Sequence, residues 1–115
     1  MSAYFSFMQG QDQEFIFEVT DEATIKKARD ILAGRETSET HVMGQILMGQ
    51  KPYNPNFSFH LRPESIRFFQ MAIEVCDANM RYVEDHLDEA GGAFLPGRIW
   101  CPWDSRLKRE VTVTH

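Results

Sequence analysis

Two cysteines and four histidines are the residues of this 115-residue chain best suited to covalent chemistry. A thiol beside an imidazole is an activated nucleophile, so Cys76 or Cys101 with His60 or His86 as base forms a candidate pair. Cys76, however, lies in an apolar run where a thiolate is penalised, and a bond between the two cysteines would silence both. A Gly-x-Ser-x-Gly turn and a glycine-rich phosphate loop are also missing. We therefore predict no catalytic residues.

Acidic side chains gather in one stretch, which raises the question of a metal site. The stretch contains Glu74, Asp77, Glu84, Asp85, Asp88 and Glu89. Calcium needs several converging oxygens, but no Asp-x-Asp-x-Asp-Gly loop is present, and side chains on a straight helix diverge. No histidine has the i, i+4 partner of a helical zinc site; the four are His41, His60, His86 and His115. We expect a solvated helix face, ordinary polar histidines, no metal and no cofactor.

The two cysteines fit two alternatives. In an exported chain, Cys76–Cys101 is the one intramolecular bridge available; it would close a loop of about 25 residues and contribute about 3.5 kcal/mol in the chain-entropy model. In a cytosolic chain the same residues would be two buried thiols. Their spacing matches neither a Cys-x-x-Cys redox motif nor a zinc ribbon.

Two proline-containing aromatic loops are better candidates for binding. The residue types that form interfaces are Trp, Tyr and Arg, and proline lowers the entropy lost when a loop is ordered. We predict partner-binding residues in both loops: Tyr53, Asn54 and Pro55 in the first, and Arg98, Trp100 and Trp103 in the second. The alternative for the two tryptophans is that they pack under a helix and complete the core.

Length and charge exclude several classes of protein. A chain of 115 residues has room for one core, so we predict a single domain spanning residues 1–115. A net charge of -5 argues against a nucleic-acid partner, because such a surface repels phosphate. No apolar run approaches the roughly 20 residues that span a bilayer. The first residues lack a basic and an apolar region, so we expect no signal peptide in this chain, and the compartment stays open.

Hydrophobic periodicity predicts the elements that carry these residues. Period-two aromatic runs at 3–8 and 14–19 predict a β-hairpin, and Thr20 to Gly34 reads as a capped amphipathic helix. Further strands are expected at 41–48, 57–61 and 68–76, the last of them central, with a turn at 62–65. Asp77 would cap a second helix over 78–90, and residues 106–114 alternate as a last, edge strand. This order predicts the α+β class: a mainly antiparallel sheet of about five to six strands with two helices packed on one face.

Several segments, taken together, resemble the BP-seventy-four-type N-terminal domain family, small bacterial domains that are often secreted. The similarity covers nearly the whole chain. It rests on Phe15-Ile-Phe-Glu-Val-Thr20, Ala28-Arg-Asp-Ile-Leu-Ala-Gly34, His41-Val-Met-Gly44, Tyr53-Asn-Pro, Phe57-Ser-Phe-His-Leu61, Met71-Ala-Ile-Glu-Val-Cys-Asp77, Tyr82-Val-Glu-Asp-His-Leu-Asp88, Gly91-Gly-Ala-Phe-Leu-Pro-Gly97 and Trp100-Cys-Pro-Trp103. The resemblance implies export for many members, and with it a Cys76–Cys101 disulfide. It brings no catalytic residue.

Three functions remain to be compared. The one that we favour is a non-catalytic domain that recognises another protein, for example as an inhibitor of an extracellular enzyme, through rigid Pro/aromatic loops. The first alternative is a lectin-like carbohydrate-binding module that uses Trp or Tyr faces, with Asn54, Asn56 and Asp104 as polar partners. The second is a small hydrolase that uses His60 with a carboxylate such as Glu74.

Overall fold

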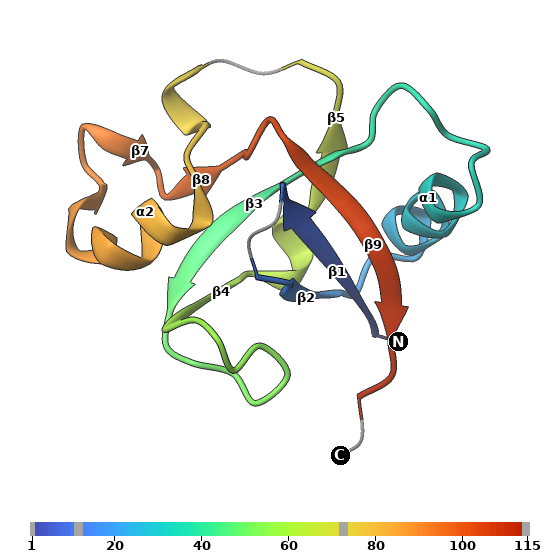
Figure 1. Ribbon diagram of the computed structural model, residues 1–115, viewed down its shortest axis with the longest axis horizontal. Coiled ribbons are helices and arrows are strands. Elements are labelled where there is room, and N and C mark those ends of the chain that lie inside the picture. The colour runs from blue at the N-terminus through green and yellow to red at the C-terminus, as the bar shows by residue number, and fades with distance from the viewer. Residues whose placement is uncertain (1, 11–12, 72–73, 114–115) are drawn as a thin grey trace.

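The computed structural model of the chain describes residues 2–10, 13–71 and 74–113. Within them the structure contains nine strands in three sheets and two α-helices, so the α+β class with antiparallel sheets is confirmed, whereas a single sheet of five to six strands is wrong. The elements are β1 Ala3–Gln9, β2 Phe15–Val19, α1 Glu22–Leu32, β3 His41–Met48, β4 Phe59–Leu61, β5 Arg67–Phe69, α2 Met80–Asp85, β6 Ala90–Gly91, β7 Phe94–Pro96, β8 Ile99–Trp100 and β9 Ser105–Val111, with 3-10 turns at Pro63–Ser65, Glu74–Cys76 and Leu87–Glu89 (Figure 1).

The first sheet has the order β2-β1-β9 and is antiparallel throughout. The predicted hairpin is confirmed: Phe5 lies opposite Phe17 and Phe7 opposite Phe15. All four of these rings are fully buried, because every second side chain of a strand points to the same face of the sheet. β9 lies at the edge of this sheet, as its charged alternation predicted.

β3 organises the second sheet. β5 pairs with its first part, β8 with its middle and β4 with its last part, all antiparallel. The strands on one side of β3 are interrupted by the turn at Pro63–Ser65, where the predicted turn is confirmed. Proline has no N–H to donate to a sheet, so a break in pairing there follows from the sequence. β6 and β7 form a separate two-stranded parallel pair.

Two buried polar side chains connect the sheets. Ser105 Oγ accepts from Val42 N at 2.9 Å and so joins β9 to β3. Asn54 Oδ1 accepts from Ile16 N of β2 at 2.9 Å, and Asn54 Nδ2 donates to the carbonyl of Phe59 in β4 at 3.3 Å. The strands β2, β1, β9, β3 and β4 therefore follow one another around the core, linked by backbone or side-chain hydrogen bonds.

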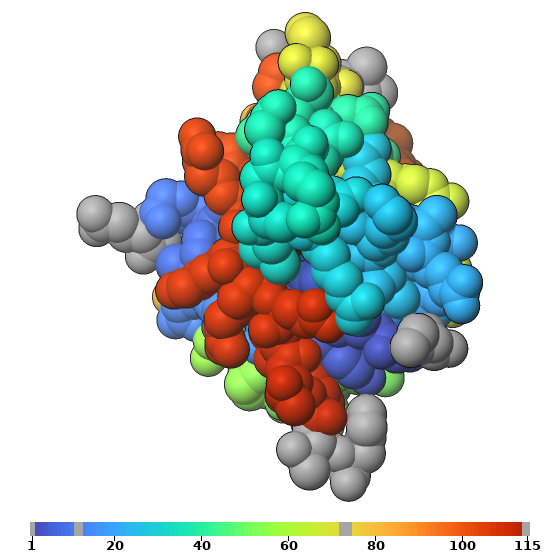
Figure 2. Space-filling view, turned by 90° about the vertical axis from the view of Figure 1, so that its right-hand side faces the viewer, coloured from blue at the N-terminus to red at the C-terminus, as the bar shows by residue number. Residues whose placement is uncertain are grey.

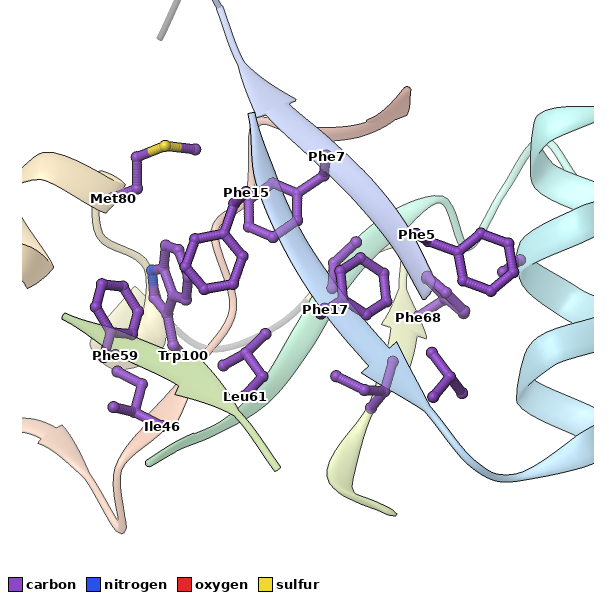
Figure 3. Close-up of a cluster of buried hydrophobic side chains, with 14 of the residues drawn as sticks. Phe5, Phe7, Phe15, Phe17, Ile46, Phe59, Leu61, Phe68, Met80 and Trp100 are labelled. Carbon is purple, nitrogen blue, oxygen red and sulfur yellow. The ribbon is translucent and has the colours of Figure 1, made fainter. Parts of the chain in front are cut away.

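Aromatic rings fill the space between the sheets (Figure 3). Trp100 is fully buried, with ring centroids of Phe7, Phe15 and Phe59 at 5.7, 5.4 and 5.5 Å. Its indole N–H donates to the carbonyl of Ala78 at 2.9 Å, which satisfies the polar end of a buried tryptophan. Of the two alternatives for this residue, the structure therefore has the core one.

The two helices lie on different sides of the molecule, α1 beside β9 and α2 near β8, and do not cover one face together (Figure 1). In α1, Asp21 caps the N-terminus by accepting from Thr24 N, and Ile25 and Ala28 are buried. The side view in Figure 2 shows α1 and the segment after it next to β9. No helix of the described residues is long and apolar enough to cross a membrane.

The second helix is shorter than predicted. α2 spans six residues and is capped by Asn79 instead of Asp77, and its regular geometry ends at His86, where φ is -129°. Met80 and Val83 are fully buried, and Leu87 is partly buried, which agrees with the predicted stripe. The turn Leu87–Glu89 continues the chain as a 3-10 helix.

The predicted central strand over residues 68–76 is wrong for the described residues. β5 ends at Phe69, and Glu74–Cys76 is a 3-10 turn, while residues 72–73 lie outside the described part of the chain. Met71 and Val75 are 77% and 56% exposed, which a strand covered on both faces would not allow. Apolar composition misled the prediction because it does not reveal that this segment is held by a covalent bond.

Candidate binding surface

A disulfide joins Cys76 to Cys101, with their Cα atoms 5.1 Å apart. Both residues are buried, and the backbone N–H of Cys101 donates to the carbonyl of Cys76 at 2.7 Å. Next to the bridge, the backbone N–H of Trp103 donates to Asp77 Oδ1 at 3.0 Å. One covalent bond and two hydrogen bonds therefore hold residues 101–103 against the turn that precedes α2.

Gln9 fixes this assembly to the first sheet. Its side chain is buried at the end of β1, where Nε2 donates to Asp104 Oδ1 at 2.7 Å and to the carbonyl of Ala78 at 3.3 Å. Its Oε1 accepts from Met80 N at 2.7 Å. A single amide thus contacts both the loop after Cys101 and the start of α2. Sequence reasoning missed Gln9, because a glutamine at a predicted strand end carries no distinctive pattern.

Apolar side chains around the bridge remain exposed to solvent. Phe69, Cys76 and Cys101 form a small buried cluster on which Met43, Ile99 and Trp103 pack. Met71 and Val75, in the chain between Phe69 and Cys76, are among the most exposed large hydrophobic residues described. We call Met71, Val75 and Trp103 together the disulfide face. Trp103 is half-buried, and its indole N–H is enclosed without a hydrogen-bond partner among the described residues.

The first predicted loop, residues 51–56, divides its side chains between structure and surface. Pro55 is exposed. The ring of Tyr53 lies against Tyr4 of β1, with centroids 5.1 Å apart, and its buried hydroxyl has no partner among the described residues. Burial, together with the nearby charge of Glu18, raises the pKa of Tyr53 to about 12. Asn54 is fully buried and bonds to β2 and β4.

The second predicted loop is divided in the same way. Arg98 is exposed at a left-handed backbone position, with φ of 61°, in a tight turn where its N–H donates to the carbonyl of Leu95 at 2.8 Å. Trp100 is buried in the core. Since Trp100 and Asn54 offer no surface to a partner, we correct the prediction and withdraw both as contact residues. Tyr53, Pro55, Arg98 and Trp103 retain exposed surface.

The polar groups of the alternative functions are largely occupied elsewhere. Of the carbohydrate-binding candidates, Asn54 connects two strands and Asp104 accepts from Gln9, which leaves the exposed Asn56. His60 of the hydrolase alternative is buried, and its Nδ1 donates to the carbonyl of Gly49 at 2.9 Å. The side chain of its proposed partner, Glu74, lies outside the described part of the chain.

The other histidines are held in a similar way. His41 Nδ1 donates to the carbonyl of Ser105 at 2.9 Å and His86 Nδ1 to that of Tyr82 at 2.8 Å, while His115 lies outside the described residues. A carbonyl can only accept, so each of these rings carries its proton on Nδ1. Among the described residues, no three His, Cys, Asp or Glu side chains are grouped as metal ligands would be.

Fold and surface define a class: a small α+β domain in which a disulfide holds an irregular segment with exposed apolar side chains. A scan against protein families identifies the class more narrowly. The chain belongs to the BP-seventy-four N-terminal domain family, which matches residues 1–114 and so confirms the resemblance seen in the sequence motifs. No curated protein and no solved structure matches the chain significantly.

Proposed function

We propose that this domain is a non-catalytic binding module that recognises another protein through the disulfide face. The observation that carries the proposal is the exposure of Met71 and Val75, 77% and 56%, beside a half-buried tryptophan on a covalently fixed segment. Exposed apolar side chains that gather in one region are a mark of interaction sites. Tryptophan is also the residue type most enriched among those that dominate interface energies.

Rigidity supports the same function. Binding loses free energy whenever flexible side chains or loops become ordered. Here the disulfide, the Cys101–Cys76 backbone hydrogen bond and the Asp77–Trp103 hydrogen bond already fix the segment that carries Trp103. The exposed residues Pro55 and Arg98 on other turns are further candidates for contact. An extracellular enzyme remains a fitting partner, because disulfides persist in oxidising compartments.

A photo-crosslinking amino acid at position 75 tests the proposal directly. Placed in the disulfide-bonded protein, it should form an adduct with one partner in extract from the native source, and excess wild-type protein should compete that adduct away. The matched control carries the same amino acid at Glu22, an exposed position of α1, and should give no such adduct.

A charged variant provides the second arm. Met71→Glu combined with Val75→Glu should keep the fold, because both side chains are already exposed, and should fail to compete for the adduct. Competition equal to that of the wild type, or identical adducts from positions 75 and 22, would exclude the disulfide face as the binding site.

A further inference from the structure

An aromatic surface distinct from the disulfide face lies where α2 meets β7 (Figure 1). The rings of Tyr82 and His86 are stacked, with centroids 3.9 Å apart and planes inclined by 17°. Phe94 of β7 meets the Tyr82 ring edge-on at 5.3 Å. Tyr82 is nevertheless 51% exposed, so part of its ring remains open to solvent. We call these three side chains the Tyr82 platform.

The platform is fixed in place before any ligand arrives. Tyr82 and His86 are four residues apart, the spacing that puts two side chains on one face of a helix. His86 Nδ1 donates to the carbonyl of Tyr82 at 2.8 Å, which orients the imidazole against the ring. Phe94 comes from a different element, so the arrangement depends on the tertiary fold as well as on the helix.

Negative charge surrounds the platform. Residues 81–89 contain four acidic side chains and one arginine. Asp85 is three residues from Tyr82 and therefore beside it on the helix surface, and it is exposed without a partner among the described residues. Glu89 Oε2 lies 4.0 Å from His86 Nε2 at the other end of the stack. Glu84 is committed elsewhere, because it accepts from Ser58 N.

We propose that the Tyr82 platform binds a cationic side chain, an arginine or lysine in an exposed segment of a partner protein. The open face of an aromatic ring attracts a cation through its quadrupole, and Asp85 and Glu89 supply complementary charge on either side of the stack. The carboxylates alone would diverge from the helix surface; the ring between them provides the point of contact. This surface does not depend on the disulfide face, and either site can fail without the other.

Hexa-arginine amide is the probe, and hexa-citrulline amide, neutral and nearly the same shape, is its control. In an NMR titration at low salt, hexa-arginine should shift the backbone signals of residues 82–89 and 94, whereas hexa-citrulline should not. Tyr82→Leu keeps apolar bulk but removes the ring, and it should weaken hexa-arginine binding about threefold to fivefold. Tyr82→Phe retains the ring face and should bind like the wild type.

Charge controls separate the site from general attraction to an acidic protein. Asp85→Asn with Glu89→Gln should weaken hexa-arginine binding more than Glu22→Gln with Glu64→Gln, which removes the same charge from two exposed positions elsewhere. Equal weakening by both pairs, equal binding of hexa-citrulline, or no loss in Tyr82→Leu would each overturn the proposal. Thermal melting of every variant confirms that the fold is retained.

Discussion

The first sheet and the segment around the disulfide are built in opposite ways. β1, β2 and β9 are seven, five and seven residues long, and the first two bury four phenylalanines in alternation. The stapled region, by which we mean residues 70–71 and 74–104, has a helix of six residues and strands of two or three. Repeated burial defines the first region, whereas single bonds at particular atoms, namely the disulfide, Gln9 and Asp77, define the second.

The difference also separates stability from recognition. Of the four large hydrophobic residues that are exposed in the described chain, three belong to the stapled region: Met71, Val75 and Tyr82. A sheet that specifies its own shape through its core leaves no such residue unused. A covalent bond frees nearby apolar side chains from core packing, which makes them available to a partner.

The largest test of this comparison uses the two tryptophans. Trp100→Ala should destabilise the protein by about 3–5 kcal/mol, because it removes a fully buried ring from the phenylalanine cluster. Trp103→Ala should cost about 1 kcal/mol or less, since Trp103 is half-buried over a small cluster. Urea unfolding followed by far-ultraviolet circular dichroism measures both. Similar losses in the two variants would mean that the stapled region contributes as much core as the sheets do.

The next largest effect concerns the bridge. Replacing Cys76 and Cys101 together by serine should lower the free energy of unfolding by about 3 kcal/mol through the unfolded chain. Hydrogen exchange should then rise mainly in residues 74–104, while the amides between β1 and β2 stay protected. Uniform loss of protection would contradict the division into two regions, because it would make the bridge part of one cooperative core.

The smallest effect belongs to a surface pair of the first sheet. Arg109 forms a bidentate pair with Glu14, and Ser6 Oγ also donates to Glu14 at 2.7 Å. Both interactions hold the pKa of Glu14 below its ordinary value of 4.5. A lowered folded-state pKa stabilises the protein above the unfolded value, and this gain is lost as the pH falls through the folded one.

Arg109→Gln should therefore lower the urea midpoint slightly at pH 7 and hardly at all at pH 3. The shift should be much smaller than that of the cysteine double variant, because exposed ion pairs contribute little. Lys108→Gln serves as the control, since it removes one charge from the same strand without breaking the pair. A larger shift at pH 3 than at pH 7 would contradict the assignment.

The regular region was predictable from the sequence, and the stapled one was not. Alternation of Phe5 and Phe7 with polar neighbours has one solution, a half-buried strand, and Asp21 before an apolar period marks a helix start. Residues 68–76 offered only apolar composition. The change from strand to turn there depends on Cys101, 25 residues beyond Cys76 in the chain, and no local pattern contains that information.

The candidate contact residues were predictable by type and not by orientation. Trp100 and Trp103 are of the same type, yet strand pairing of Trp100 with Gly44 directs one ring into the core while Trp103 stays half-exposed in the loop after the bridge. Asn54 looked like a loop amide because loops are rich in asparagine; its burial arises from its bonds to β2 and β4. Tyr82 was invisible as a surface feature because its contact with Phe94 requires the fold.

Asn54 also settles what happens at the outer edge of β2. A strand at the end of a sheet presents free N–H and C=O groups, and these are a template for pairing with another chain and for aggregation. The Asn54 amide occupies the N–H of Ile16 on that edge and continues the contact into β4. A loop side chain thereby acts as a substitute strand, so a family member that must remain unaggregated can keep an aromatic-rich hairpin without offering β2 as a site for intermolecular sheet growth.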